Sequence, residues 1–496
     1  MEASTVSIYK LKKKSYPRIA PFNPSEFYPE YPFKEISNNK NYIYEGFRYL
    51  LNLMGLDKKN WNNKEWNPLG EIIKLGDSVV IKPNLVLDNL QNQDCITTHT
   101  SLIRAIIDYV IIALKKTGEI IVGDASLQKC NFETLIQYNG LLKTINFYKS
   151  KGINIKLIDF RREEMRINKI KSTSSDKGIE IVKLEGDPKG YKVINLKKGS
   201  NLYKLSLNNG YKKFRVTNYD PKIMKMAHNQ LDHKYLISNS IIQADVIINV
   251  AKFKSHRKAG ITGCLKNSIG INGSKDWLPH HRYGALREGG DEYLKKNASK
   301  YLYGKLNDID DIFLIKYTPI YRFLYYPLLF LRIGLRKLIN FVSNDKTLEG
   351  DWHGNDTIWR TIADLNQILI YSDKTGKIRD KPQKKRLYFC DAVITGQSEG
   401  PLSPIPVKSG IITGGYDPLM VDFAIASIMN LDYQKIPQLL KLFKIREHSI
   451  SKYKTTDLLI ISNFLKWNNK RYNQLTEFLS FIPSYGWKNI INNNYK

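Results

Sequence analysis

Short apolar runs alternate with segments of helical periodicity along two stretches of the chain, residues 76–160 and 351–465. Runs such as GDSVVIKPNLV (76–86) and EIIVGDAS (119–126) are typical of strands buried on both faces, and residues 101–118 repeat their apolar positions with the spacing of a helix. Strands joined to helices by short connections predict right-handed βαβ units. We therefore expect an α/β fold with a mostly parallel, Rossmann-like sheet.

Two segments interrupt this pattern. Residues 161–220 alternate polar and apolar positions, are strongly basic and contain turn signals, which predicts an antiparallel β insertion. Residues 281–350 form a second, aromatic-rich insertion that we expect to be helical, whereas residues 1–40 predict an irregular lead-in. The expected organisation is a lead-in and helix (1–75), the first part of the core (76–160), the basic β-rich insertion (161–240), a core strand with a lysine–histidine motif (241–280), the helical insertion (281–350), the second part of the core (351–465) and a C-terminal tail (466–496).

The charge and the cysteine content indicate which partners and which cellular compartment suit the chain. The 496 residues carry a formal net charge of +30, which attracts phosphorylated substrates, anionic lipid or nucleic acid. No nucleic-acid-binding motif accompanies the charge, so nucleic acid is the less favoured partner. The four cysteines are far apart, which argues against an iron–sulfur cluster or a disulfide framework and favours a reducing cytoplasm.

Polar residues follow four of the predicted strands. In a parallel α/β sheet, ligands bind beyond the carboxyl ends of the strands. Those positions hold Lys82 with Asn84, then Asp124, then the basic segment after strand 244–250, and finally Asp391. We expect these side chains to meet at one rim of the sheet.

The basic segment AKFKSHRKAG, residues 251–260, has a directional pattern. If the strand continues through it, Lys252, Lys254 and His256 share one face, because side chains alternate along a strand. Arg257 and Lys258 fall outside that register, and we expect them to be solvated. Three cationic or titratable groups on one face repel one another unless an anion lies among them.

A glycine-rich turn follows. Thr262 is a candidate cap for a short helix whose free N–H groups would seat an anion, and Lys266 and Asn267 follow one turn later. The sequence thus predicts a site for a phosphate or carboxylate. The expected substrate-binding residues are Lys82, Asn84, Lys252, Lys254, Thr262, Lys266 and Asn267. His256, together with Asp124 or Asp391, is expected to transfer protons or to bind a divalent cation.

The remaining histidines are open to two interpretations. His99 precedes a predicted helix, so that capping is its first role and metal binding its second. His353, with neighbouring acidic residues, and Asp124 are the other metal candidates. His280 and His281 lie at the start of the second insertion and are expected at the surface.

Residues 312–342 are rich in Leu, Phe and Tyr, but their longest uncharged run is 323–331. A membrane-spanning helix needs about 20 mostly apolar residues, so this segment is not expected to span. It is interrupted by Lys316, Arg322, Arg332, Arg336 and Lys337. A helix of this kind either lies on a membrane surface or packs on protein, and we favour the membrane surface because the whole chain is cationic.

Several segments, taken in order, resemble a known family: VVIKPNLV, TTHTSLIRAIIDYV, EIIVGDAS, ADVIINVAKFKSHRKAGITGCLKNSIG and GGYDPLMVDFAIASIM. They resemble the family catalogued as domain of unknown function 362, whose pattern includes a lysine–histidine block, a Lys–Asn pair and a late Asp-Pro…Asp element. Ala251 and Ser255 stand where that pattern has proline and threonine. Many members carry a ferredoxin-like iron–sulfur domain, but this chain lacks the corresponding cysteines.

Three functions follow from these observations. The first is an enzyme acting on an anionic substrate, such as a phosphorylated sugar or a lipid-linked intermediate, at the strand-end rim. The second is a non-catalytic cationic scaffold on anionic membrane or nucleic acid. The third, from a distant likeness to lactate-racemase-type proteins, is a cofactor-dependent redox or racemase-like protein.

Overall fold

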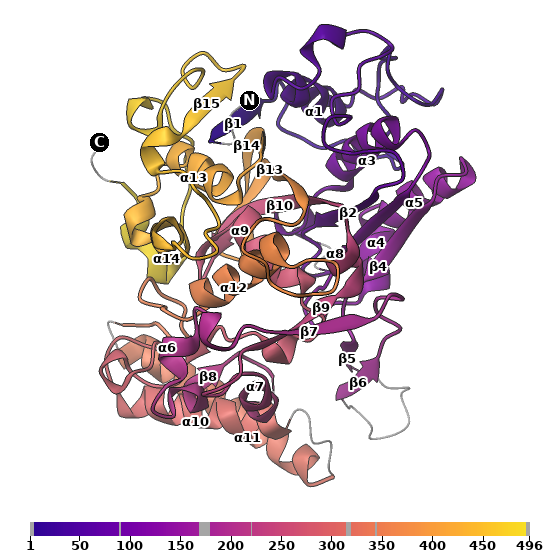
Figure 1. Ribbon diagram of the computed structural model, residues 1–496. Helices are drawn as coiled ribbons and strands as arrows, with labels where there is room; N and C mark the ends of the chain where they lie inside the picture. The colour runs from indigo at the N-terminus through magenta and orange to yellow at the C-terminus, as the bar shows by residue number, and fades with distance from the viewer. Residues whose placement is uncertain are drawn as a thin grey trace.

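The computed structural model describes residues 4–88, 91–167, 179–219, 221–313, 319–342 and 345–492. Within them, a central nine-stranded sheet lies between two layers of helices (Figure 1). The order across the sheet is β15 (Leu459–Ser462), β1 (Thr5–Lys10), β14 (Ser403–Gly415), β13 (Lys385–Glu399), β10 (Val246–His256), β2 (Ser78–Pro83), β3 (Glu119–Asp124) and β4 (Ile155–Asp159), with β11 (Gly260–Thr262) paired to β10.

The centre of the sheet is parallel, as the sequence predicts. Strands β13, β10, β2, β3 and β4 run in one direction, so their carboxyl ends lie at one edge. Beyond β13 the sheet is mixed, because β13 and β14 form a long antiparallel hairpin and β1 pairs antiparallel to β14.

The expectation of an irregular lead-in is wrong at its start. Residues Thr5–Lys10 form β1, between β14 and β15, and Val6 and Ile8 are fully buried there. A six-residue strand has little local signal. It is stabilised here by partners from the opposite end of the chain, which the local pattern could not reveal.

Helices cover both faces of the sheet. Along β10, Val246, Ile248 and Val250 pack on one side, towards α1 (Tyr42–Leu53), α3 (Thr100–Leu114), α4 (Phe132–Tyr138) and α5 (Leu141–Ser150). Ala251 and Phe253 pack on the other side, towards α8 (Asn239–Gln243), α9 (Cys264–Asn267), α12 (Ile358–Tyr371), α13 (Pro418–Ile428) and α14 (Pro437–Leu440). Burial on both faces explains the continuous apolar runs of the sequence.

The first insertion is built from small antiparallel pairs, as predicted. Strand β5 (Glu163–Ile167) pairs with β6 (Ile179–Lys183), and β7 (Tyr191–Asn195) with β9 (Lys234–Ser238). The short β8 (Phe214–Arg215) pairs with β12 (His281–Arg282) of the second insertion, which joins the two insertions.

The remaining helices are α2 (Gln93–Ile96), α6 (Tyr203–Ser206), α7 (Pro221–Ala227), α10 (Ala298–Phe313) and α11 (Pro319–Val342).

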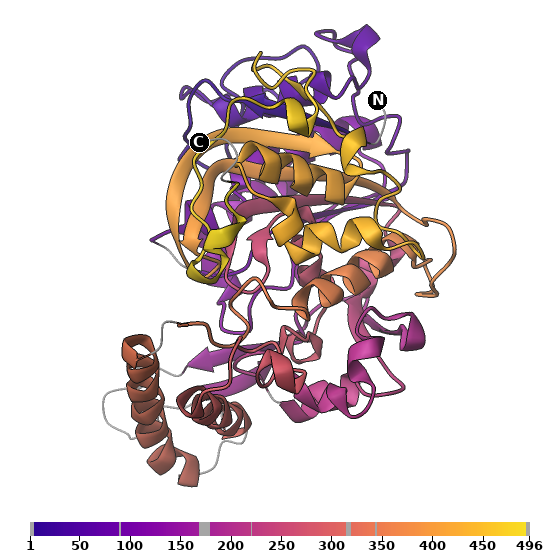
Figure 2. The same cartoon turned by 90° about the vertical axis from the view of Figure 1, so that its left-hand side faces the viewer.

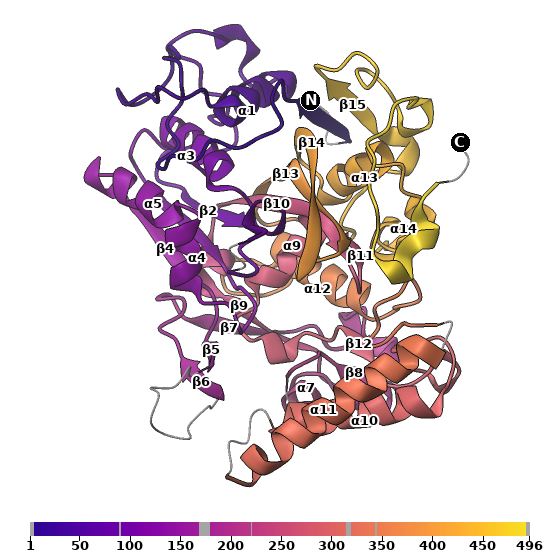
Figure 3. The same cartoon turned by 180° about the vertical axis from the view of Figure 1, so that it is seen from behind.

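Helices α10 and α11 lie together at the end of the molecule opposite α1 and α3 (Figures 1 and 3). Lys316, part of the connection between them, lies outside the described residues. None of the described helices combines the length and the apolar character needed to cross a membrane.

Candidate functional site

Two buried ion pairs stand at the carboxyl edge of the parallel strands. Lys82 Nζ lies 2.7 Å from Asp124 Oδ1, and Lys252 Nζ lies 3.2 Å from Asp391 Oδ2. Lys82 and Asp124 lie at the ends of β2 and β3, whereas Lys252 and Asp391 lie within β10 and β13, where the regular parallel pairing of these two strands ends; all four side chains are buried. The predicted convergence of strand ends is therefore present, but these charges are paired with each other inside the protein.

A network of amides connects the next residues. Asn267 Oδ1 accepts hydrogen bonds from Lys82 Nζ at 3.0 Å and from Asn84 Nδ2 at 3.1 Å. Lys254 Nζ donates to Asn84 Oδ1 at 2.7 Å and also to the Ile96 carbonyl. Lys82, Asn84, Lys254 and Asn267 thus form one cluster, as the sequence predicts.

Gly270 lets the chain pass directly over the first ion pair. A Cβ at this position would overlap Asp124 Oδ1 and lie 2.6 Å from Lys82 Nζ. We expect Gly270→Ala to force the pair apart and to lower the free energy of unfolding by about 1–3 kcal/mol, as measured by urea denaturation. The matched control is Gly199→Ala, where a Cβ meets nothing within 4 Å. Equal stability of the two variants would contradict this role.

The second ion pair is completed by the N-terminal segment. Tyr16 OH donates to Asp391 Oδ1 at 2.5 Å and lies 2.6 Å from Lys252 Nζ. The Tyr16 ring stacks on His99 with centroids 4.0 Å apart, and the His99 main-chain N–H donates to Asp391 Oδ2 at 3.0 Å. Nothing local in the sequence distinguishes Tyr16 from the other tyrosines of the lead-in.

The anion seat expected at the glycine-rich turn is filled by the protein itself. The first N–H groups of α9, those of Cys264 and Leu265, donate to the two carboxylate oxygens of Asp422 at 2.6 and 2.9 Å. Thr262 does not cap this helix, and its buried hydroxyl has no described hydrogen-bond partner. This corrects the assignment of Thr262 to the site: a carboxylate from α13 occupies the first two N–H groups of the helix, where the sequence predicts a bound anion.

The same carboxylate explains the late Asp-Pro…Asp element. Asp417 caps its own helix, α13, by accepting from Leu419 N and Met420 N at 2.9 and 3.1 Å. Asp422, one turn further along, caps α9. Both acidic residues therefore hold helices in place around the Lys266–Asn267 pair.

Three buried or half-buried lysines near the rim have no carboxylate partner among the described residues: Lys254, Lys266 and Lys275. Lys254 and Lys275 donate only to amide or carbonyl oxygens, and Lys266 Nζ has no hydrogen-bond partner in the described part of the chain. Burial, then the charges of Lys82 and Lys258, lowers the pKa of Lys266 to about 7. Burial also lowers the pKa of Lys275 to about 7.

His256 faces this group with a defined tautomer. Its Nδ1 accepts the main-chain N–H groups of Lys258 and Ala259, each at 3.1 Å. Burial, followed by the charges of Lys266 and His280, lowers the pKa of His256 well below its usual value, so the ring is neutral at pH 7. A neutral imidazole that accepts at Nδ1 carries its proton on Nε2. The geometry therefore favours a hydrogen-bond donor, whereas the sequence suggested a base.

His280 has the opposite tautomer. Its Nδ1 donates to the Leu278 carbonyl at 2.6 Å, which leaves Nε2 as the acceptor nitrogen. His281 is buried, and His280 is half-buried and close enough to Lys266 and Lys258 for their charges, after burial, to lower its pKa to about 3. The expectation that this pair lies at the surface is wrong, because the β8–β12 pairing folds the second insertion back onto the rim.

Lys258 also differs from the expectation. Its ammonium donates to Thr217 Oγ1 at 2.9 Å and lies 3.4 Å from His281 Nδ1, and its side chain is half-buried. The hairpin from β10 to β11 turns Lys258 towards the insertions, so it is not simply solvated. The prediction that Lys252, Lys254 and His256 share one face is compatible with β10, which continues unbroken to His256.

The three metal candidates do not come together. His99 Nδ1 lies 2.8 Å from Ser101 Oγ, and Asp124 forms an ion pair with Lys82. His353 is exposed, and its Nδ1 lies 3.3 Å from the Gly486 carbonyl oxygen. The described residues contain no cluster of three His, Cys, Asp or Glu side chains that could hold a metal ion. All four cysteines are free and buried.

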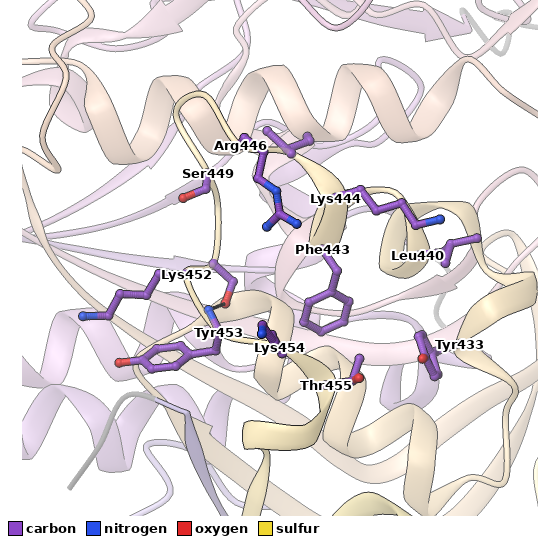
Figure 4. Close-up of a pocket in the computed structure, with 12 residues that line it drawn as sticks. Tyr433, Leu440, Phe443, Lys444, Arg446, Ser449, Lys452, Tyr453, Lys454 and Thr455 are labelled. Carbon is purple, nitrogen blue, oxygen red and sulfur yellow. Dashed lines mark hydrogen bonds between the residues drawn. The ribbon is translucent and has the colours of Figure 1, made fainter.

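A hollow of about 330 Å³ lies elsewhere, on the segment 433–455. Figure 4 shows the Arg446 side chain extending towards the Phe443 ring. Lys444, Lys452 and Lys454 are its other cations, and all four are exposed, so water already solvates them. The buried lysines at the rim are not solvated by water in this way, so a bound anion would stabilise them more, and the rim is the stronger candidate site.

The fold and the site define an α/β protein whose parallel strand ends enclose a cluster of buried lysines and histidines. The family model described as Domain of unknown function (DUF362) matches residues 79–184 and 198–427. This chain belongs to that family, which confirms the resemblance seen in the sequence. Searches of the curated proteins and of the solved structures each gave no significant match.

The match covers β2, β3, β10 and β13 together with α9 and α13, and therefore the whole strand-end cluster. Tyr16 and the hollow at 433–455 lie outside the matched ranges.

Proposed function

We propose that the protein is an enzyme that binds a small anionic substrate, carrying a phosphate or carboxylate, among Lys254, Lys266 and Lys275. The observation that carries this proposal is the full or partial burial of these three amines without a carboxylate partner among the residues that the structure describes. Buried cations destabilise a protein unless a counter-charge reaches them, and the half-buried Lys266 gives the cluster a side that an external anion can approach.

The surrounding groups suit proton transfer on the bound anion. His256 offers an Nε2–H donor, whereas the acceptor Nε2 of His280 and the amine of Lys266 can take up a proton. A lysine whose pKa is about 7 is divided between its two protonation states at neutral pH, which is the condition for acid–base catalysis. Asp124 and Asp391 stabilise Lys82 and Lys252 rather than contacting the substrate.

The test is binding of sulfate, an anion whose own charge does not change between pH 6 and pH 9. Sulfate binds the protonated amines, and Lys266 and Lys275 lose their protons as the pH rises above about 7. Sulfate affinity should therefore be highest near pH 6 and should fall steadily towards pH 9, as measured by isothermal titration calorimetry. Circular dichroism at each pH checks that the protein stays folded. Absence of sulfate binding at pH 6, or an affinity that does not change with pH, would count against the proposal.

A non-catalytic scaffold predicts a different outcome. Its affinity for anions would depend on many exposed lysines, and it would fall steeply with added sodium chloride and only weakly with pH. Mass spectrometry of small molecules that co-purify with the protein would then identify the natural anion or show that none is retained.

A further inference from the structure

Helix α11 has an inner side that attaches it to the protein. Leu335 and Ile339 pack against Tyr303 of α10 and against Leu348, and only 2% of Ile339 is exposed. These contacts hold α11 and α10 together, and Figure 2 shows both helices at one end of the molecule, projecting from the rest.

The outer side of α11 is apolar as well. Phe330 is 68% exposed, Leu331 50%, Leu338 46% and Phe341 91%. Their separations of one, three, seven and eight residues place them within about 100° of the helix circumference, on a face that adjoins the one formed by Leu335 and Ile339. Single exposed apolar residues are ordinary, but a continuous stripe that includes two exposed phenylalanines indicates a contact surface.

The charge of α11 indicates what that surface contacts. Its sequence contains Arg322, Arg332, Arg336 and Lys337 and no acidic residue. A second copy of this chain, also at +30, would bring the same cations face to face, which opposes association through α11. An anionic lipid surface provides both an apolar medium for the stripe and negative charge for the cations.

We propose that α11 docks on the surface of an anionic lipid membrane. The helix lies in the plane of the surface, with Phe330, Leu331, Leu338 and Phe341 among the upper parts of the acyl chains and the exposed Lys337 beside the lipid phosphates. This inference does not depend on the proposed enzymatic function.

Helices α10 and α11 are also connected to the candidate site. Tyr303 OH donates to Glu349 Oε1 at 3.1 Å, Thr217 Oγ1 lies 3.2 Å from Glu349 Oε2, and Lys258 Nζ donates to Thr217 Oγ1 at 2.9 Å. Burial opposes the ionisation of Glu349, but Lys258, Arg257 and Arg336 lower its pKa overall, so the carboxylate is charged. A docked α11 would therefore be connected to Lys258, whose charge acts on Lys266, through Tyr303, Glu349 and Thr217.

The test is co-sedimentation of the full chain with vesicles of phosphatidylcholine alone and of phosphatidylcholine mixed with phosphatidylserine. We expect binding to the mixed vesicles and little binding to phosphatidylcholine alone. The double variant Phe330→Ser and Phe341→Ser should lower the partition coefficient at least about tenfold, because two apolar rings no longer enter the bilayer. The matched control is Leu231→Ser with Leu465→Ser, two residues that are 78% and 84% exposed elsewhere; it should bind like the unchanged protein.

Four outcomes would overturn the proposal. One is failure of the unchanged protein to bind the mixed vesicles, and another is equal binding by the two double variants. A third is a concentration-dependent dimer in analytical ultracentrifugation that only the phenylalanine variant loses, which would make a second copy the occupant. The last is duplex DNA binding that only the phenylalanine variant loses. Circular dichroism and thermal melting of both variants establish that each is folded before the comparison.

Discussion

Replacing Asp391 with alanine lowers the free energy of unfolding by about 3–5 kcal/mol, the usual effect of removing one partner from a buried ion pair. Asp391 is fully buried, and its carboxylate lies 3.2 Å from Lys252 Nζ and accepts from Tyr16 OH at 2.5 Å. Alanine leaves an ammonium group and a hydroxyl without their acceptor in a place that water does not reach. Urea denaturation followed by tryptophan fluorescence measures the loss.

Two further variants distinguish the effect of breaking the ion pair from the effect of removing any acidic side chain. Glu477→Ala removes an acidic residue whose salt bridge with Lys466 is exposed, and we expect little change in stability. The double variant Lys252→Met with Asp391→Leu replaces both charges with apolar groups, and it should be more stable than Asp391→Ala alone. If Asp391→Ala is as stable as Glu477→Ala, the pair does not have the structural role that its burial indicates.

The second large effect concerns Lys266. Lys266→Met should weaken sulfate binding at pH 6 by about 10- to 100-fold, because a hydrogen bond from a charged donor contributes about 1.5–3 kcal/mol. It should also reduce the decrease in affinity between pH 6 and pH 9, since one of the two amines that titrate near pH 7 is gone. The stability of the variant should not fall, because methionine fills a similar volume and the ammonium makes no hydrogen bond to described residues.

The control for Lys266→Met is Lys444→Met, which removes an exposed lysine from the hollow at 433–455. If the two variants bind sulfate equally well, anions do not bind at the rim. If Lys444→Met has the larger effect, the hollow at 433–455 is the anion site and the proposed function fails. In neither case is the membrane proposal affected, because it concerns only the outer side of α11.

The local pattern of apolar and polar residues was sufficient to predict the strands of the core and the site residues that follow them. Lys82, Asp124 and Asp391 each follow an apolar run, and Asn84 comes two residues after Lys82. Because parallel strands end at the same edge of a sheet, recognising the runs as strands was enough to predict that their ends meet. The alternation of side chains along a strand predicts one face for Lys252, Lys254 and His256, and β10 is compatible with that prediction.

The features that the sequence analysis predicted wrongly or missed share one physical cause: each depends on contact between segments that are far apart in the chain. Whether the N-terminus of α9 is free depends on Asp422, a residue on another helix, and the glycine-rich turn alone could not show that it is occupied. The position of His280 depends on the pairing of β8 with β12. Tyr16 reaches Asp391 because β1 is held between β14 and β15.

By itself, the sequence of this protein determined the α/β class, the parallel strands and the residues at their carboxyl ends. These features follow from the length and spacing of apolar runs, which can be read from neighbouring positions in the chain. Only the tertiary structure decided which charges neutralise each other. It pairs Lys82 with Asp124 and Lys252 with Asp391, and within the described part of the chain it gives Lys254, Lys266 and Lys275 no carboxylate partner. Charge pairing depends on distances of a few ångströms between segments far apart in the chain, and those distances are set by packing.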